Sequence, residues 1–204
     1  MRRFLESSAA VDWESTPVRA LAVQLRGADA DGLAIARRCF EWVRDRIPHT
    51  SDHELDPISV AASDVLVLGT GFCYSKSHLL AALLRANGIP AGLVYQRLSI
   101  GDGSFCLHGL NAAWIPEFGW YRFDARGSRA DLVAEFAPPE EKLPFACSEP
   151  GEACFPGIWA EPTAVVMRAL RSHASRTDLL RNLPDAQSLG QPDLVMNAWQ
   201  RTGS

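Results

Sequence analysis

Apolar residues recur at helical spacing in the first quarter of the chain. Residues 16–27 place Pro17 in a first helical turn and Gly27 at the end, a pattern typical of a short helix. Residues 32–47 repeat apolar side chains every three to four positions, and Pro48 follows as a stop signal. The pattern predicts two helices that pack over the core.

The longest apolar helical face follows a glycine-rich turn. Residues 57–71 combine a short helical stretch with an apolar run, which ends in the turn from Gly69 to Gly71. A helix is then predicted from Cys73 to Asn87, where the letters NGIP close it. Cys73 therefore stands at the start of this helix.

Beyond Pro90 the pattern changes to strand formers. Residues 91–100 are rich in β-branched and aromatic side chains, and the letters GDGS form a turn. Residues 105–115 and 119–125 are predicted to be two further strands, joined by the turn PEFG. Helices followed by a strand meander indicate an α+β fold.

Residues 129–204 shift toward proline and irregular sequence. Helical pieces are expected at 162–171 and 175–182, with a possible edge strand at 141–145. We therefore predict a core with its N-terminal helices in residues 1–128 and a C-terminal extension that wraps this core.

Composition narrows the class of protein. A chain of 204 residues with 47% hydrophobic and 22% charged residues is long enough to bury a core as one domain with extensions. The net charge is −4 and the arginines are scattered, so neither a nucleic acid nor a membrane is an expected partner. Polar residues interrupt the N-terminus before a hydrophobic stretch develops, so we do not interpret it as a secretory signal and expect a cytoplasmic protein.

The cysteines fit a reducing compartment. Their number is odd and their spacing is not that of a disulfide scaffold, so at least one thiol should be free; they are Cys39, Cys73, Cys106, Cys147 and Cys154. Cys147 and Cys154 flank the letters SEPGEA in the extension, and we expect both to be free thiols.

A cysteine at a helix N-terminus has a chemical use. The free N–H groups and the positive end of the helix dipole favour a thiolate, and the same N–H groups can hold a developing oxyanion. Gly69 and Gly71 would leave room for the substrate backbone. Position alone is weak evidence, because a free cysteine is also a common core filler.

Two downstream residues complete a possible catalytic constellation. His108 lies in one predicted strand and Asp124 in the next, so both side chains can point to one face if the strands pair. The imidazole would then exchange a proton with Cys73, and the carboxylate would orient the ring.

The letters GTGFCYSKSHLLAALLRANGIPAGLVY, followed by LHGLNAAWIPEFGWYRFDARG, resemble the transglutaminase-like superfamily, which is related to papain. The resemblance covers roughly residues 60–127. It implies an α+β core of the papain-like type, with the nucleophile at a helix N-terminus packed on an antiparallel sheet. It also implies that Cys73 is the nucleophile, His108 the general base and acid, and Asp124 the orienting carboxylate.

The expected reaction is thiol-dependent amide chemistry through an acyl-enzyme thioester, by a cysteine peptidase or amidase or by glutaminyl acyl transfer. The expected partner is a protein or peptide that carries an amide, and no metal or organic cofactor is implied. Two departures, at Gly109 and at the pair Ala125–Arg126, alter the wall around the triad and argue against protein crosslinking. The alternatives are an arylamine N-acetyltransferase-like enzyme that uses acyl-CoA, and a catalytically idle binding module.

Other candidate residues have less specific signals. His49 and His53 lack the spacing of a zinc site and are expected to be solvated in a loop. His78 should be structural. Trp42 and His49 are both possible second oxyanion donors, and no motif chooses between them. The remaining aromatic residues near the triad are expected to pack in the core; they are Tyr74, Trp114 and Trp120.

Cys106 lies two residues before His108, so its thiol should share the catalytic face. We hypothesise that oxidation links it to Cys73 and switches the nucleophile off. The alternative is a small apolar filler.

Overall fold

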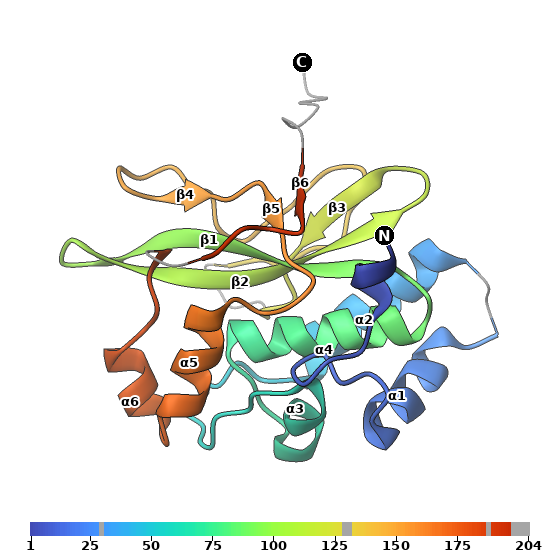
Figure 1. The fold of residues 1–204 in the computed structure, drawn as a ribbon, viewed down its shortest axis with the longest axis horizontal. Coiled ribbons are helices and arrows are strands. Elements are labelled where there is room, and N and C mark those ends of the chain that lie inside the picture. The colour runs from blue at the N-terminus through green and yellow to red at the C-terminus, as the bar shows by residue number, and fades with distance from the viewer. Residues whose placement is uncertain (29–30, 128–131, 187–188, 197–204) are drawn as a thin grey trace.

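The chain folds around a curved antiparallel sheet in this computed structural model, which describes all residues except 29–30, 128–131, 187–188 and 197–204 (Figure 1). The strand order is β3-β2-β1-β4. The strands span Ala91–Gly101 (β1), Ser104–Ile115 (β2), Gly119–Phe123 (β3) and Ala153–Cys154 (β4). The predicted meander is therefore confirmed, because β1, β2 and β3 follow one another as antiparallel neighbours.

Four helices cover one face of this sheet, and α4 lies directly against it (Figure 1). They span Thr16–Arg26 (α1), Gly32–Arg46 (α2), Ala62–Leu68 (α3) and Cys73–Ala86 (α4). The sequence predicted all four. Nearly every residue of α4 is buried, because the other helices surround it on the sides that the sheet leaves open.

The sheet buries both of its faces. Odd-numbered strand residues such as Leu93 and Leu107 join the core around α4, whereas Val94, Leu110 and Ala112 join a second, smaller cluster on the opposite face. The 3-10 helix Arg2–Leu5 and the two-stranded sheet of β5 (Gly157–Ile158) and β6 (Leu194–Val195) lie near this second cluster. The 3-10 helix and the β5–β6 sheet thus pack against the sheet that the middle of the chain forms.

The edge strand predicted at 141–145 is absent from the structure, and β4 pairs with β1 instead. Pro144 has no N–H to donate to a strand neighbour. The side chain of Gln96 donates instead to the Phe145 carbonyl at 3.0 Å. This segment is therefore held by side chains rather than by a backbone ladder.

Two short helices close the C-terminal part, α5 (Ala164–Ser172) and α6 (Arg176–Arg181), as predicted. Leu170 and Leu179 join the main core. No helix among the described residues combines the length and the apolar character that a membrane crossing requires.

Candidate active site

Cys73 is the first residue of α4, directly after the turn that contains Gly69 and Gly71. Gly69 ends α3 in the left-handed conformation, at a φ of 69°. A Cβ at Gly71 would lie 2.8 Å from Ser75 Oγ and 3.1 Å from the Lys76 side chain. Gly71 therefore lets this turn pack closely on the first turn of α4, and the expected room for substrate stays a prediction.

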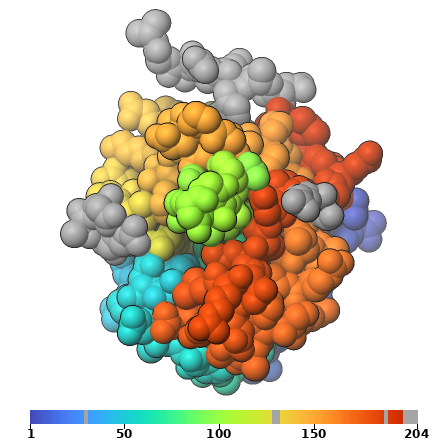
Figure 2. All heavy atoms as spheres, turned by 90° about the vertical axis from the view of Figure 1, so that its left-hand side faces the viewer, coloured from blue at the N-terminus to red at the C-terminus, as the bar shows by residue number. Residues whose placement is uncertain are grey.

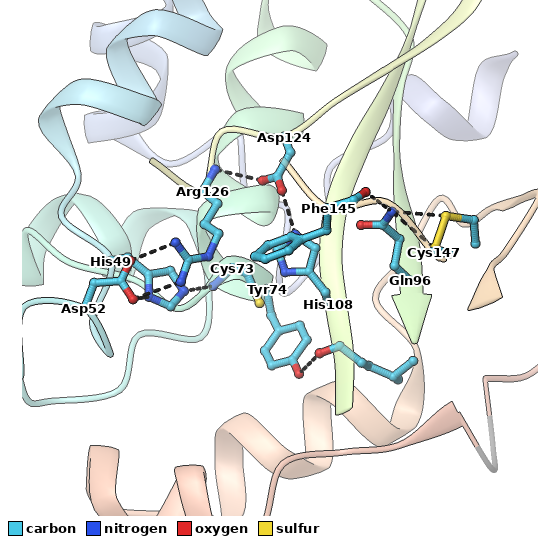
Figure 3. A network of polar contacts seen from close by, with 12 residues as sticks. His49, Asp52, Cys73, Tyr74, Gln96, His108, Asp124, Arg126, Phe145 and Cys147 are labelled. Carbon is cyan, nitrogen blue, oxygen red and sulfur yellow. Dashed lines mark hydrogen bonds and ion pairs between the residues drawn. A yellow bond between two sulfur atoms is a disulfide. The ribbon is translucent and has the colours of Figure 1, made fainter. Parts of the chain in front are cut away.

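The structure brings Cys73, His108 and Asp124 together (Figure 3). His108 Nε2 lies 2.6 Å from Asp124 Oδ2, and both side chains are almost completely buried. Strand β3 pairs with β2 as far as Asn111, and Asp124 follows directly after β3. The end of β3 thus brings the carboxylate to the strand residue His108.

The electrostatics favour an ion pair between Cys73 and His108. Burial by itself would raise the pKa of Cys73, but the charge of His108 and hydrogen bonds with His108 and His49 outweigh it and lower the pKa to about 6. Burial would likewise lower the pKa of His108, but the Asp124 carboxylate and the Cys73 thiolate raise it to about 10. A thiolate beside an imidazolium is the form of a cysteine nucleophile that reacts fastest.

Gly109 is required by the packing of β2 on α4. A Cβ at this position would lie 3.1 Å from Tyr74 Cδ1 and 3.3 Å from Tyr74 Cα. Tyr74 is buried, and its hydroxyl donates to the Leu107 carbonyl. The glycine after His108 therefore lets the strand approach the start of the helix closely.

A histidine that the sequence placed in solvent lies beside Cys73. The backbone N–H of Cys73 donates to His49 Nε2 at 3.1 Å, and the His49 side chain is only 8% exposed. Loop solvation is therefore wrong for His49, although it is right for the exposed His53. The contact follows from a pairing of segments far apart in sequence, because His49 and Gly71 form a parallel β-bridge.

The C-terminal segment supplies a wall of the site. The Phe145 ring packs edge-on against the His108 ring, with the centroids 4.9 Å apart, and the Arg126 guanidinium lies over the same phenyl ring. Gln96 holds the Phe145 carbonyl and also lies against the sulfurs of Cys147 and Cys154 (Figure 3). Nothing in the local sequence around Phe145 signalled this contact.

Cys147 and Cys154 form a disulfide, so the expectation that both are free thiols is wrong. Gly151, at a φ of 91°, turns the chain between them and brings the two Cα atoms to 5.8 Å. Cys39, Cys73 and Cys106 are free, which confirms the expectation of at least one free thiol. Disulfides persist in oxidising compartments, so the cytoplasmic address stays a prediction.

A pocket of about 250 Å³ opens above Cys73. Cys73, His108, His49 and Arg126 line its polar part. Its apolar lining comes from the β1–β2 hairpin, the C-terminal segment and α6, through Leu98, Ile100, Phe145, Leu180 and Leu183. Figure 2 looks onto the tip of this hairpin, with the C-terminal segments packed around it. The pocket beside Cys73 is thus small and partly apolar.

The structure also places the other residues that the sequence analysis singled out around the site. Cys106 lines the same pocket as Cys73, and burial raises the pKa of its thiol to about 12; its oxidation to Cys73 stays a hypothesis. His78 is structural as expected, because its Nδ1 lies 2.8 Å from the Val60 carbonyl.

Trp42 lines a different pocket and is not the second oxyanion donor. Trp114 is 37% exposed, so its expected place in the core is wrong.

One ionisable group near the site had no signal in the sequence. Lys76 is buried below Cys73, where its ammonium donates to the Ile47 carbonyl. Burial lowers its pKa to about 7, although the Asp124 charge opposes this. The described residues contain no cluster of side chains that could hold a metal ion.

The sequence also matches a known protein family. The transglutaminase-like superfamily matches the chain over residues 19–125, slightly more than half of its length. No curated protein matches it.

Several solved structures are similar. A candidate cysteine protease from Cytophaga hutchinsonii is 23% identical, with a TM-score of 0.49, over 60% of this chain and 40% of that one. The periplasmic domain of TgpA from Pseudomonas aeruginosa is 26% identical, with a TM-score of 0.47, over 61% of this chain and 46% of that one. This chain therefore spans less than half of the length of these structures.

Proposed function

Because the chain belongs to the transglutaminase-like superfamily, we propose that it is a thiol-dependent enzyme that cleaves or exchanges amide bonds through Cys73, His108 and Asp124. One observation carries the proposal. The 2.6 Å contact between His108 and Asp124 orients an imidazole beside a cysteine at the N-terminus of a buried helix. This arrangement suits a nucleophile, a proton carrier and an orienting carboxylate.

The first half of the reaction forms a thioester. The Cys73 thiolate attacks the amide carbonyl, the Sγ–C bond forms and the π electrons move to the oxygen. When the tetrahedral intermediate collapses, the C–N bond breaks and the His108 imidazolium gives its proton to the leaving nitrogen. Asp124 holds the ring in the required orientation and stabilises its charged form.

The second half regenerates the thiol. Water or an amine attacks the thioester and gives a proton to the neutral His108, and the Cys73 thiolate leaves. Attack by water gives hydrolysis or deamidation, and attack by an amine gives acyl transfer. The substrate that we propose is a protein or peptide amide, for which glutaminyl peptides are the first to screen.

The proposal is tested by trapping the acyl-enzyme with p-nitrophenyl acetate. After an acid quench, intact mass and peptide mapping should find one acetyl group, on Cys73. The adduct should be absent in Cys73→Ala and reduced about a hundredfold in initial rate in His108→Ala, since general base catalysis contributes roughly that factor. Cys39 is an internal control, because burial raises the pKa of its thiol to about 12.

The same assay addresses the two alternatives. Acetyl-CoA in place of the ester should give no adduct; rapid acetylation of Cys73 would instead favour the acetyltransferase. An ester that labels Cys73 no faster than it labels Cys106 would reject the catalytic proposal and favour an idle binding module.

A further inference from the structure

The segment that carries His49 is tied to the turn before α4. Thr50 N–H donates to the Gly71 carbonyl at 3.1 Å, and the Thr70 hydroxyl donates to the Pro48 carbonyl at 3.0 Å. The Lys76 ammonium holds the Ile47 carbonyl from below. Backbone and side-chain contacts therefore hold the segment of His49 next to the turn before Cys73.

The ring of His49 has a defined resting state. Its Nε2 accepts the Cys73 N–H, so the single ring proton of the neutral form is on Nδ1. Nδ1 lies 3.6 Å from Asp52 Oδ1, a distance suited to an ion pair once the ring takes up a second proton. The Phe72 ring packs edge-on against the imidazole. Cys73 and Asp52 are titratable groups that face His49, and the Arg126 guanidinium bound to Asp52 adds a positive charge beside them.

Arg126 connects this second histidine–carboxylate pair to the first. Its guanidinium binds both oxygens of Asp52, at 2.9 Å and 2.8 Å, while its backbone N–H donates to Asp124 Oδ1 at 2.8 Å. Asp124 in turn holds His108. One continuous chain of contacts thus runs around Cys73, from His49 through Asp52, Arg126 and Asp124 to His108 (Figure 3).

We propose that His49 is the side-chain donor that stabilises the oxyanion formed when Cys73 attacks a carbonyl, and that Asp52 and Arg126 are the positioning residues that hold it. This inference rests on the proposed function. It assigns a reaction role to a histidine that is buried against the backbone of the nucleophile. Arg126 stands at one of the two places where this chain departs from the family pattern, so the connection belongs to this chain.

Protonation of His49 switches Nε2 from acceptor to donor. The proton comes from solvent before the attack, and Asp52 balances its charge, since the neighbouring His49 and Arg126 hold the pKa of this carboxyl well below its usual range. The Cys73 N–H is then released, and both N–H groups can point to the carbonyl oxygen. During attack the Sγ–C bond forms, the π pair moves to the oxygen, and the oxyanion accepts the two hydrogen bonds without taking a proton from His49.

Two reagents separate this role from a general effect on the thiol. Iodoacetamide alkylates Cys73 by displacement and forms no oxyanion, whereas p-nitrophenyl acetate acylates it through a tetrahedral intermediate. His49→Leu should therefore slow acylation about a hundredfold, the cost of one oxyanion donor, and slow alkylation much less. His49→Gln, whose amide can donate and accept, should recover most of the acylation rate.

Asp52→Asn is a second variant, which keeps the imidazole in place. It should lower the ratio of the acylation rate to the alkylation rate of Cys73 by roughly tenfold. His53→Gln is the matched control, an exposed histidine four residues further on, and should leave the ratio unchanged. Parallel losses of both rates in His49→Leu, or no loss in either, would overturn the inference. A wild-type Cys73 that neither reagent labels selectively would instead overturn the proposed function.

Discussion

Around Cys73, single side chains decide the charge of the thiol. Burial opposes ionisation, so the lowered pKa depends on the two imidazoles that flank the sulfur. His108 contributes through its charge and through a hydrogen bond, and His49 adds a further hydrogen bond. The nucleophile is therefore expected to lose its reactivity when the larger of these contributions is removed.

The pH dependence of alkylation tests this balance. In the wild type, the rate of iodoacetamide labelling at Cys73 should be half-maximal near pH 6, the pKa of the thiol, and stay level until His108 loses its proton near pH 10. In His108→Ala, the midpoint should move to pH 9 or above, because burial raises the pKa of the thiol and His108 no longer lowers it. The rate at pH 7 should fall at least tenfold.

Peptide mass spectrometry measures the rate of alkylation at each cysteine separately. Cys106 is the internal comparison, since it lines the same pocket but burial raises the pKa of its thiol to about 12. An alkylation profile of Cys73 that is the same in the wild type and in His108→Ala would show that the two residues do not form an ion pair.

The sequence singled out Cys73, His108 and Asp124 as candidates, which the structure brings together, but it left the place of His49 open. Cys73, His108 and Asp124 each stand in a local pattern, a helix start or a strand, and their order matches a known family. His49 reaches Cys73 because its segment pairs with Gly71, more than twenty residues away, and such a pairing leaves no periodic pattern in the sequence. Its environment therefore emerges only when the chain is folded.

At the scale of elements, the segment between Leu143 and Cys154 is the least predictable part of the site. Its prolines and polar residues exclude a regular strand, and its position depends on Gln96, the disulfide and the contact of Phe145 with His108. The letters SEPGEA between the two cysteines fit free thiols as well as a bridge. Only the turn at Gly151, which brings the two cysteines together, distinguishes a disulfide from free thiols.

Removal of this disulfide should loosen the segment. The disulfide joins residues that are seven positions apart. The entropy of closing a loop of this length predicts that it stabilises the fold by about 2 kcal/mol. Chemical denaturation of Cys147→Ser/Cys154→Ser should therefore show a free energy of unfolding lower by roughly that amount. A reducing agent should destabilise the wild type to the same extent and leave the double variant unchanged. Peptide mapping without reduction should recover the Cys147–Cys154 link, and two alkylated thiols would contradict it.

At the scale of the whole molecule, the part of the chain that follows the strands completes a site whose chemistry lies in the middle. The matched superfamily region stops at residue 125, yet α6 and the segment of Phe145 supply much of the apolar wall. Helices, strands and their order were predictable because each has its own periodicity. The wall was not, since Leu180 on α6 and Leu183 after it reach the pocket through tertiary packing. One contact of this packing is the bond from Leu107 N–H to the Pro184 carbonyl.

This arrangement predicts that the pocket selects the acyl group of the substrate. Its small volume and its apolar lining from the hairpin and α6 should favour a short apolar group next to the scissile carbonyl. Each methylene that the wall buries should raise the acylation rate roughly fourfold, from about 0.8 kcal/mol of transfer free energy. p-Nitrophenyl butyrate should therefore acylate Cys73 faster than the acetate does.

Leu183→Glu should abolish this preference, because a carboxylate in the wall makes burial of an alkyl chain unfavourable. The measured quantity is the ratio of butyrate to acetate acylation rates, in which any general loss of thiol reactivity cancels. Leu68→Glu is the matched control, since Leu68 is an exposed leucine on α3 outside the pocket, and it should keep the wild-type ratio. If Leu183→Glu also kept that ratio, the C-terminal segment would only cover the core, and selection would have to come from the hairpin alone.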